Sequence, residues 1–275
     1  MDFDTITVTP VSPHIGAEVS GIDLQQPLTN RQVKEVYQAL LEYLVIFFHD
    51  QDIDFEAHRR FTGYFGDLHV HVGGKGTASR MVEGFPEIRH QHFDETSKRV
   101  SGETWHTDQS CAEIPPMASV LQQRIVPPNG GGDTLFASMY AAYDALSNTM
   151  QGFLEGLTAT HDGAIMFDRT DVVYPKAVHP VITTHPDTGK KLIYVNPGFT
   201  THINELSRPE SDALLGFLFE HCAKPDFQYR FRWRTNSIAF WDNRPSQHQA
   251  IWDYYPETRS GYRIQITGKE GPTPV

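Results

Sequence analysis

Apolar residues recur at three- and four-residue spacing in two long segments of the chain, which is the pattern of a helix that buries one face. The first segment begins at Thr29, where Thr29 and Gln32 have the spacing of a capping box. The second begins at Ser207, and Glu210 completes the same box. Both segments are therefore predicted to form helices that pack on a larger core.

Most of the remaining pattern consists of short alternating or wholly apolar runs, which indicate strands. Alternation is clearest in residues 227–233, where aromatic residues occupy every second position, and in residues 259–267. Further strands are predicted at 5–8, 17–22, 45–48, 117–126 and 237–241, a hairpin at 177–184 and 191–196, and helices at 54–65 and, as a short pair, within 138–155. The sum predicts a mainly β fold with flanking helices, namely a double-stranded β-helix (a jelly roll, cupin-like).

Residues 72–104 are rich in glycine and then polar, and they show no clear period. In a compact domain, so long an irregular stretch is usually a lid or a binding loop. A chain of 275 residues without repeats or an obvious linker suits one large domain. We therefore predict a single catalytic domain over residues 1–275, with a mobile lid at 72–104.

Composition narrows the possible functions. The chain has 23 Lys and Arg against 34 Asp and Glu, a net charge of −11, which argues against a nucleic-acid partner. Two cysteines provide no disulfide framework. We expect no signal peptide, because the N-terminus lacks a basic and apolar leader, and no membrane span, because no run of about 18 apolar residues occurs. These features predict a cytoplasmic enzyme.

Candidate metal chemistry begins in Trp-His-Thr-Asp-Gln-Ser, residues 105–110. His106 and Asp108 are two apart, so an extended backbone directs both side chains to one face. His248 follows 140 residues after Asp108, at the end of Trp-Asp-Asn-Arg-Pro-Ser-Gln-His. Two imidazoles and a carboxylate, with no thiol, match the facial triad that holds non-haem Fe(II). Among 14 histidines, His-x-Asp alone would carry little weight.

Two arginines downstream suggest anion binding. Arg259 and Arg263 share one face of the alternating segment and stand roughly 13 Å apart at the rise of a strand. A guanidinium group is a fixed fork that suits a carboxylate, sulfonate or sulfate. Thr134, in Asn-Gly-Gly-Gly-Asp-Thr-Leu-Phe (129–136), could donate a hydrogen bond beside one of these anions.

Four motifs together resemble the taurine dioxygenase family of Fe(II)/2-oxoglutarate-dependent dioxygenases: His-Thr-Asp, Gly-Gly-Asp-Thr-Leu-Phe, Asn-Pro-Gly-Phe-Thr-Thr-His (196–202) and Trp-Asp-Asn-Arg-x-x-x-His. The resemblance implies Fe(II), the co-substrates 2-oxoglutarate and O2, and a homo-oligomer, either a dimer or a tetramer. By position it implies iron on His106, Asp108 and His248, 2-oxoglutarate on Thr134 and Arg259, and substrate on His71, Arg263 and Phe199. Phe199 could also belong to the core, and His69 alternates with His71.

The implied activity is hydroxylation of a small anionic organic substrate, with a taurine-like organosulfonate and release of sulfite as the leading hypothesis. The sequence departs from taurine dioxygenase where the amine end of taurine would be held, because Gly102 replaces an asparagine. Gln109 and Cys111 also replace apolar or aromatic pocket residues.

Several alternatives stay open. The substrate could be an alkyl sulfate ester, an aryloxyalkanoate or another carboxylate. A barrel that binds metal and 2-oxoglutarate without turnover is a hypothesis of another class. A zinc hydrolase could use the same ligands, although an arginine for 2-oxoglutarate argues against it.

Overall fold

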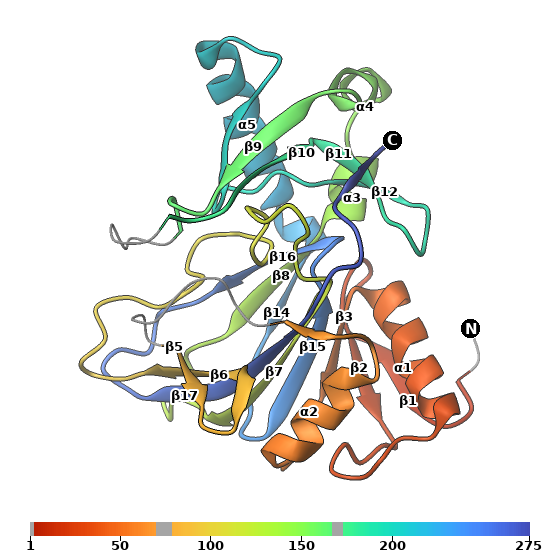
Figure 1. The fold of residues 1–275 in the computed structure, drawn as a ribbon, viewed down its shortest axis with the longest axis vertical. Helices are drawn as coiled ribbons and strands as arrows, with labels where there is room; N and C mark the ends of the chain where they lie inside the picture. The colour runs from red at the N-terminus through yellow and green to blue at the C-terminus, as the bar shows by residue number, and fades with distance from the viewer. Residues whose placement is uncertain (1–2, 70–78, 167–172) are drawn as a thin grey trace.

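A computed structural model describes residues 3–69, 79–166 and 173–275. Within these residues the fold is mainly β with flanking helices, as Figure 1 shows. None of the described helices has the length and apolar character needed to cross a membrane.

The largest sheet in the described part of the chain has nine strands. Eight of them run in the order β1 (Thr7–Pro10), β2 (Ala17–Ser20), β3 (Val45–Phe48), β15 (Ser237–Asp242), β7 (Ala118–Ile125), β17 (Arg259–Ile266), β6 (Phe85–Phe93) and β5 (Ser79–Val82). The ninth, β4 (Leu68–His69), also pairs with β17. The predicted strands at 45–48, 117–126, 237–241 and 259–267 lie next to one another in this sheet.

A three-stranded sheet of β14 (Gln228–Phe231), β8 (Thr134–Ser138) and β16 (Ser246–Ala250) packs against the large sheet. Phe47 on β3 stacks on Phe231 of β14, with ring centroids 3.9 Å apart, and meets Phe136 of β8 edge-on at 5.7 Å. Aromatic pairs in these geometries add to the free energy gained by burying their area. The two sheets form a sandwich around one apolar core, as expected for a jelly roll.

The other elements form the region at the top of Figure 1. They comprise β9 (Thr158–Asp162), β10 (Lys176–Pro180), β11 (Ile182–Thr184), β12 (Lys191–Ile193), β13 (Thr200–Ile203), β18 (Thr273–Pro274) and η1 (Pro225–Phe227), with helices α3 (Met139–Asp144), α4 (Asn148–Leu154) and α5 (Arg208–Cys222). The predicted hairpin is correct only for β11 and β12. Residues 176–180 pair instead with β9, in a different sheet from β11 and β12.

The predicted helix starts are confirmed. Thr29 and Gln32 form the capping box of α1 (Asn30–Tyr43), and the Asp54 side chain caps α2 (Phe55–Gly63). Ser138 and Ser147 cap α3 and α4. Helices α1 and α2 cover the outer face of the large sheet, where their apolar residues join a second core.

Part of the segment predicted to be irregular, residues 72–104, forms an antiparallel hairpin of β5 and β6. Strand β6 has no clean alternation of apolar and polar residues, since polar side chains such as Arg89 are buried in it. Burial of those polar groups hides the strand from a hydrophobicity pattern. Residues 70–78 lie outside the described residues, and the mobile lid stays a prediction.

His58 on α2 gives the fold a predictable dependence on acid. It is fully buried, and burial lowers its pKa from 6.5 to about 3. Between these values the unfolded chain binds the proton and the native protein does not, so the free energy of unfolding falls as pH drops from 6.5 towards 3, by up to about 1.4 kcal/mol per pH unit for this group. We expect His58→Gln to flatten the dependence in urea unfolding curves. An unchanged slope would contradict this assignment.

Candidate metal centre

The backbone brings the two predicted histidine ligands together. His106 forms an isolated antiparallel bridge with His248 on β16. Its N–H donates to the His248 carbonyl at 3.1 Å, and the His248 N–H donates back at 2.9 Å. The two imidazole centroids are 4.1 Å apart. Residues 142 positions apart in the chain are thus fixed side by side by main-chain hydrogen bonds.

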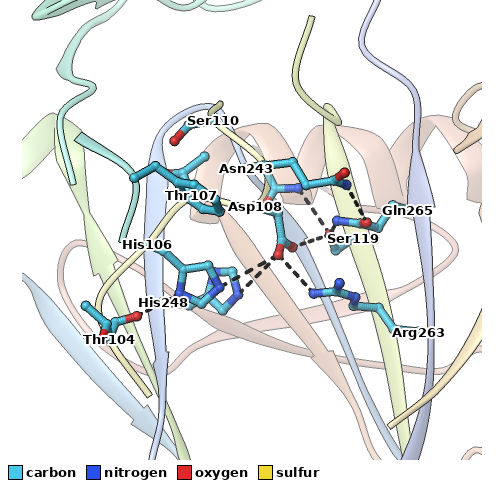
Figure 2. Close-up of polar contacts among 12 residues, drawn as sticks. Thr104, His106, Thr107, Asp108, Ser110, Ser119, Asn243, His248, Arg263 and Gln265 are labelled. Atoms are coloured by element: carbon cyan, nitrogen blue, oxygen red, sulfur yellow. Dashed lines mark hydrogen bonds and ion pairs between the residues drawn. The ribbon is translucent and has the colours of Figure 1, made fainter. Parts of the chain in front are cut away.

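Asp108 completes the predicted triad. One of its carboxylate oxygens, Oδ1, lies 3.7 Å from His106 Nε2 and 3.9 Å from His248 Nε2. Each of the three residues offers one ligand atom, and these atoms all lie within 4.8 Å of one another. Figure 2 shows both rings directed at the carboxylate. This is the spacing expected of groups that share one metal ion.

A hydrogen bond on the side of the ring away from Asp108 fixes the orientation of His106. Its Nδ1 lies 2.8 Å from the Thr104 carbonyl oxygen. Because a carbonyl can only accept, Nδ1 carries the proton and the lone pair of Nε2 faces the carboxylate. Hydrogen bonds of this kind set the tautomer and direction of histidine ligands in metal sites.

Asp108 is held by a buried hydrogen-bond network (Figure 2). Its Oδ2 accepts from the Ser119 hydroxyl at 2.8 Å. The same hydroxyl oxygen accepts from Asn243 Nδ2 and from Gln265 Nε2, both at 3.1 Å. With both acceptor positions filled, the single proton of Ser119 points to Asp108. The hydrogen bond from Ser119 therefore fixes the position of Asp108 Oδ2 before any ligand binds.

Electrostatics favour the protonation states that a metal requires. Burial lowers the pKa of both His106 and His248, so both imidazoles are neutral at neutral pH. Burial alone would raise the pKa of Asp108, but the Arg263 guanidinium, helped by the Ser119 hydrogen bond, outweighs it and lowers that pKa. Two neutral imidazoles and one carboxylate form a donor set that fits Fe(II).

Arg259 is a buried cation without an acidic partner in the described part of the chain. It is 4% exposed, and its Nε donates to the Gly132 carbonyl at 3.0 Å. The Gln123 amide oxygen, turned toward it, accepts from both Nη atoms at 3.0 Å. Its guanidinium lies 5.6 Å from the ring centre of Trp233. Asp133 also acts on it through charge, but this carboxylate forms its ion pair with Arg230. A buried guanidinium whose own hydrogen bonds go to neutral groups is costly unless an anion pairs with it.

Thr134 lies in the same part of the site. Its hydroxyl oxygen accepts from Trp233 Nε1 at 2.9 Å, which leaves its own proton available to a ligand. Gly132 allows this arrangement, because its φ is +82° and a Cβ there would come within 2.9 Å of Arg259 Cδ.

One cavity of about 960 Å³ joins these groups. It brings together seven of the eight predicted site residues, namely His106, Asp108, Thr134, Phe199, His248, Arg259 and Arg263. Phe199 is buried, and its ring centre lies 6.4 Å from that of His106, so it forms a wall of the cavity. His71 lies outside the described residues.

Sequence reasoning missed several residues of the site, among them Ser119, Gln123, Trp233 and Arg89. Ser119 and Gln123 are polar positions on one face of the strand predicted at 117–126, on either side of Leu121, which was an available signal. Trp233 belongs to the alternating aromatic run, but nothing in that run indicates contact with Thr134. Arg89 also lines the cavity, and it falls in the segment predicted to be irregular.

Comparisons with known proteins agree with this geometry. The family model described as taurine catabolism dioxygenase TauD, TfdA family, matches residues 7–265. An alpha-ketoglutarate-dependent sulfonate dioxygenase of Saccharomyces cerevisiae is 33% identical over 94% of this chain and 66% of its own length. An alkylsulfatase of Acinetobacter baylyi is 29% identical over 93% of this chain and 83% of its own.

Among solved structures, a taurine dioxygenase from Burkholderia xenovorans superposes with a TM-score of 0.86 at 35% identity, covering 98% of this chain and 93% of that one. The predicted fold class is thereby confirmed. The match of the family model over nearly the whole chain, on top of a His-Asp-His site inside the jelly roll, leads to one conclusion: the chain belongs to the TauD/TfdA family of taurine catabolism dioxygenases.

Proposed function

We propose that the protein is an Fe(II)- and 2-oxoglutarate-dependent dioxygenase that hydroxylates a small organosulfonate and releases sulfite. The observation that carries the proposal is the common cavity, into which a three-residue metal site and a buried arginine without an acidic partner among the described residues both open.

His106, Asp108 and His248 would hold the iron, which when bound supplies the chemistry that activates O2. Arg259 would pair bidentately with the distal carboxylate of 2-oxoglutarate, and the free Thr134 proton would donate to the same group. Trp233 orients Thr134, and Ser119 orients Asp108. These residues therefore position the reactants.

The substrate would bind through its anionic head to Arg263. The Arg263 side chain is 11% exposed, and its Nη1 donates to Asp108 Oδ1 at 2.9 Å. Its Nε–H is buried and has no acceptor among the described residues. A sulfonate has three oxygens with which to satisfy such donors while its carbon chain lies near the metal site. His71 would contact the same head, and Phe199 would line the chain.

A sulfate ester is the second candidate. Its head has the same charge and the same three terminal oxygens as a sulfonate, so Arg263 alone cannot distinguish the two. The similarity to an alkylsulfatase favours it. Aryloxyalkanoates and other carboxylates would bind through a planar head instead.

Oxygen uptake and sulfite release test the proposed function directly. With Fe(II) and 2-oxoglutarate, we expect a short alkanesulfonate to stimulate O2 consumption and to yield succinate and sulfite in equal amounts. Sulfate esters and aryloxyalkanoates serve as comparison substrates. Succinate formation that no anion stimulates would contradict the proposal, and sulfate release from esters alone would favour the second candidate.

We also propose a homo-oligomer, either a dimer or a tetramer, and a cytoplasmic location. The family resemblance supports the first, and the sequence composition supports the second.

A further inference from the structure

The two histidines of the metal centre are supported in different ways. His106 donates its second ring N–H to the Thr104 carbonyl oxygen. His248 Nδ1 is buried, and it has no hydrogen-bond partner among the described residues. Histidine ligands usually depend on such a hydrogen bond for their orientation. The direction of the His248 ring is therefore set by another kind of contact.

Two aromatic rings pack against His248. The ring centre of Trp241 lies 4.9 Å from that of His248, and the two planes meet at 58°. The ring centre of Phe136 lies 6.1 Å away, with the planes at 27°. Phe136 on β8 is the direct cross-strand partner of His248, whereas Trp241 belongs to β15 of the large sheet. All three side chains are buried. The imidazole is thus packed against one ring from each sheet of the sandwich, which restricts its rotation.

The indole N–H of Trp241 begins a buried chain of hydrogen bonds that ends on Asp108. Trp241 Nε1 donates to Asn243 Oδ1 at 2.8 Å. Because an indole N–H can only donate, the amide oxygen of Asn243 faces Trp241 and its NH2 group faces Ser119. The Ser119 hydroxyl then donates to Asp108 Oδ2 (Figure 2). The orientation of Asn243, and through it the direction of the bond to Asp108, therefore follows from the indole N–H.

We propose that Trp241 is a positioning residue of the metal centre: its ring holds the His248 imidazole, and its N–H directs the hydrogen bonds that hold Asp108. Together the two contacts set the position of a nitrogen ligand relative to the oxygen ligand. The inference rests on the assignment of the metal ligands within the proposed function, and it does not depend on which substrate is used.

Substitution of each of two tryptophans that line the cavity tests the proposal. Trp241→Phe keeps an aromatic ring but removes the indole N–H and part of the contact with His248. We expect its affinity for Mn(II), measured by equilibrium dialysis without 2-oxoglutarate, to fall roughly 10- to 100-fold, the range for residues that support a metal ligand. Trp233→Phe is the matched control, because the indole N–H of Trp233 bonds to Thr134, which is not one of the three ligands. Its affinity for Mn(II) should match that of the unaltered protein.

Asn243→Ala separates the two contacts of Trp241. It leaves the packing on His248 in place and removes the chain of hydrogen bonds to Asp108. We expect a loss of about 10-fold in Mn(II) affinity, at the lower end of the same range. This variant also keeps the proposal testable if circular dichroism shows that Trp241→Phe does not fold.

The Co(II)-loaded protein gives a readout that is independent of turnover and that core packing alone would not produce. Each histidine ligand contributes one solvent-exchangeable Nδ1–H proton, and the paramagnetic ion shifts its NMR signal away from the rest of the spectrum. We expect Trp241→Phe to move the signal of His248. The signal of His106 should stay nearly in place, because Thr104 still holds that ring. A general loosening of the core would move both signals.

Unchanged Mn(II) affinity in Trp241→Phe or in Asn243→Ala would overturn the proposal. So would an equal loss in Trp233→Phe, or an equal displacement of both Co(II)-shifted signals. Failure of the proposed function looks different. A wrong ligand assignment would leave the Mn(II) affinity of Asp108→Ala intact, and a wrong substrate class would leave succinate formation unstimulated by any sulfonate while the metal affinities follow the order expected here.

Discussion

The Asp108→Ala protein is expected to bind Fe(II) weakly and to form no succinate above background. Asp108 is the only carboxylate in the candidate triad, and it supplies the negative charge that two neutral imidazoles cannot. Removing a residue that supports a ligand typically costs 10- to 100-fold in metal affinity or activity. We therefore expect the loss of a ligand itself to exceed roughly 100-fold in both.

Equilibrium dialysis with Fe(II) and with Mn(II), alongside succinate formation, measures this effect. Ser119→Ala is the comparison variant, because it keeps the ligand itself and removes the hydrogen bond to Asp108 Oδ2, together with the two that the hydroxyl accepts from Asn243 and Gln265. Its loss should fall within the milder range. Circular dichroism establishes that each variant is folded. Unchanged metal affinity in Asp108→Ala would refute the assignment of the ligands.

The second large effect is expected from Arg259→Ala. The variant loses the charge-assisted bidentate pair with 2-oxoglutarate, so its affinity for that co-substrate should fall by about 2–5 kcal/mol, or roughly 30- to 5,000-fold. Gln123 and Gly132, which now bond to the guanidinium, would also lose their partner. Titration of 2-oxoglutarate into the anaerobic protein gives the dissociation constant.

Arg263→Ala is the matched control, since it also removes one arginine from the same cavity. It should impair use of the sulfonate and leave the affinity for 2-oxoglutarate nearly intact. Equal losses of 2-oxoglutarate affinity in the two variants would contradict the division of roles between these arginines.

The parts of the structure that depend on local chemistry could be predicted from the sequence. Helix starts at Thr29, Asp54 and Ser207 follow from side-chain caps that bond within three residues. The His106, Asp108 and His248 cluster was predictable because few residue types suit a ferrous ion. The strand over 259–266 was predictable because one of its faces is apolar.

The features that could not be predicted depend on which strands pair and in what register. The hairpin of β5 and β6 was missed because polar side chains of β6 such as Glu87 and Arg89 are buried, so burial and hydrophobicity do not coincide. Arg89 gained its position only through the register of β6 on β17. Gln123 could not be linked to Arg259 from sequence, because the two residues meet through the pairing of β7 with β17.

The main-chain bridge between His106 and His248 has a consequence for the identity of the bound ion. A cage already tied together by peptide groups rearranges little on loading, but its three donors leave open positions that zinc can also use, so the ligand set does not by itself select iron. Zinc and copper bind nitrogen and oxygen donors more strongly than ferrous iron does. The metal ion bound in a living cell would then depend on which exchangeable ions are abundant around the newly folded protein. Iron starvation would leave the site filled with a metal ion that does not support the reaction.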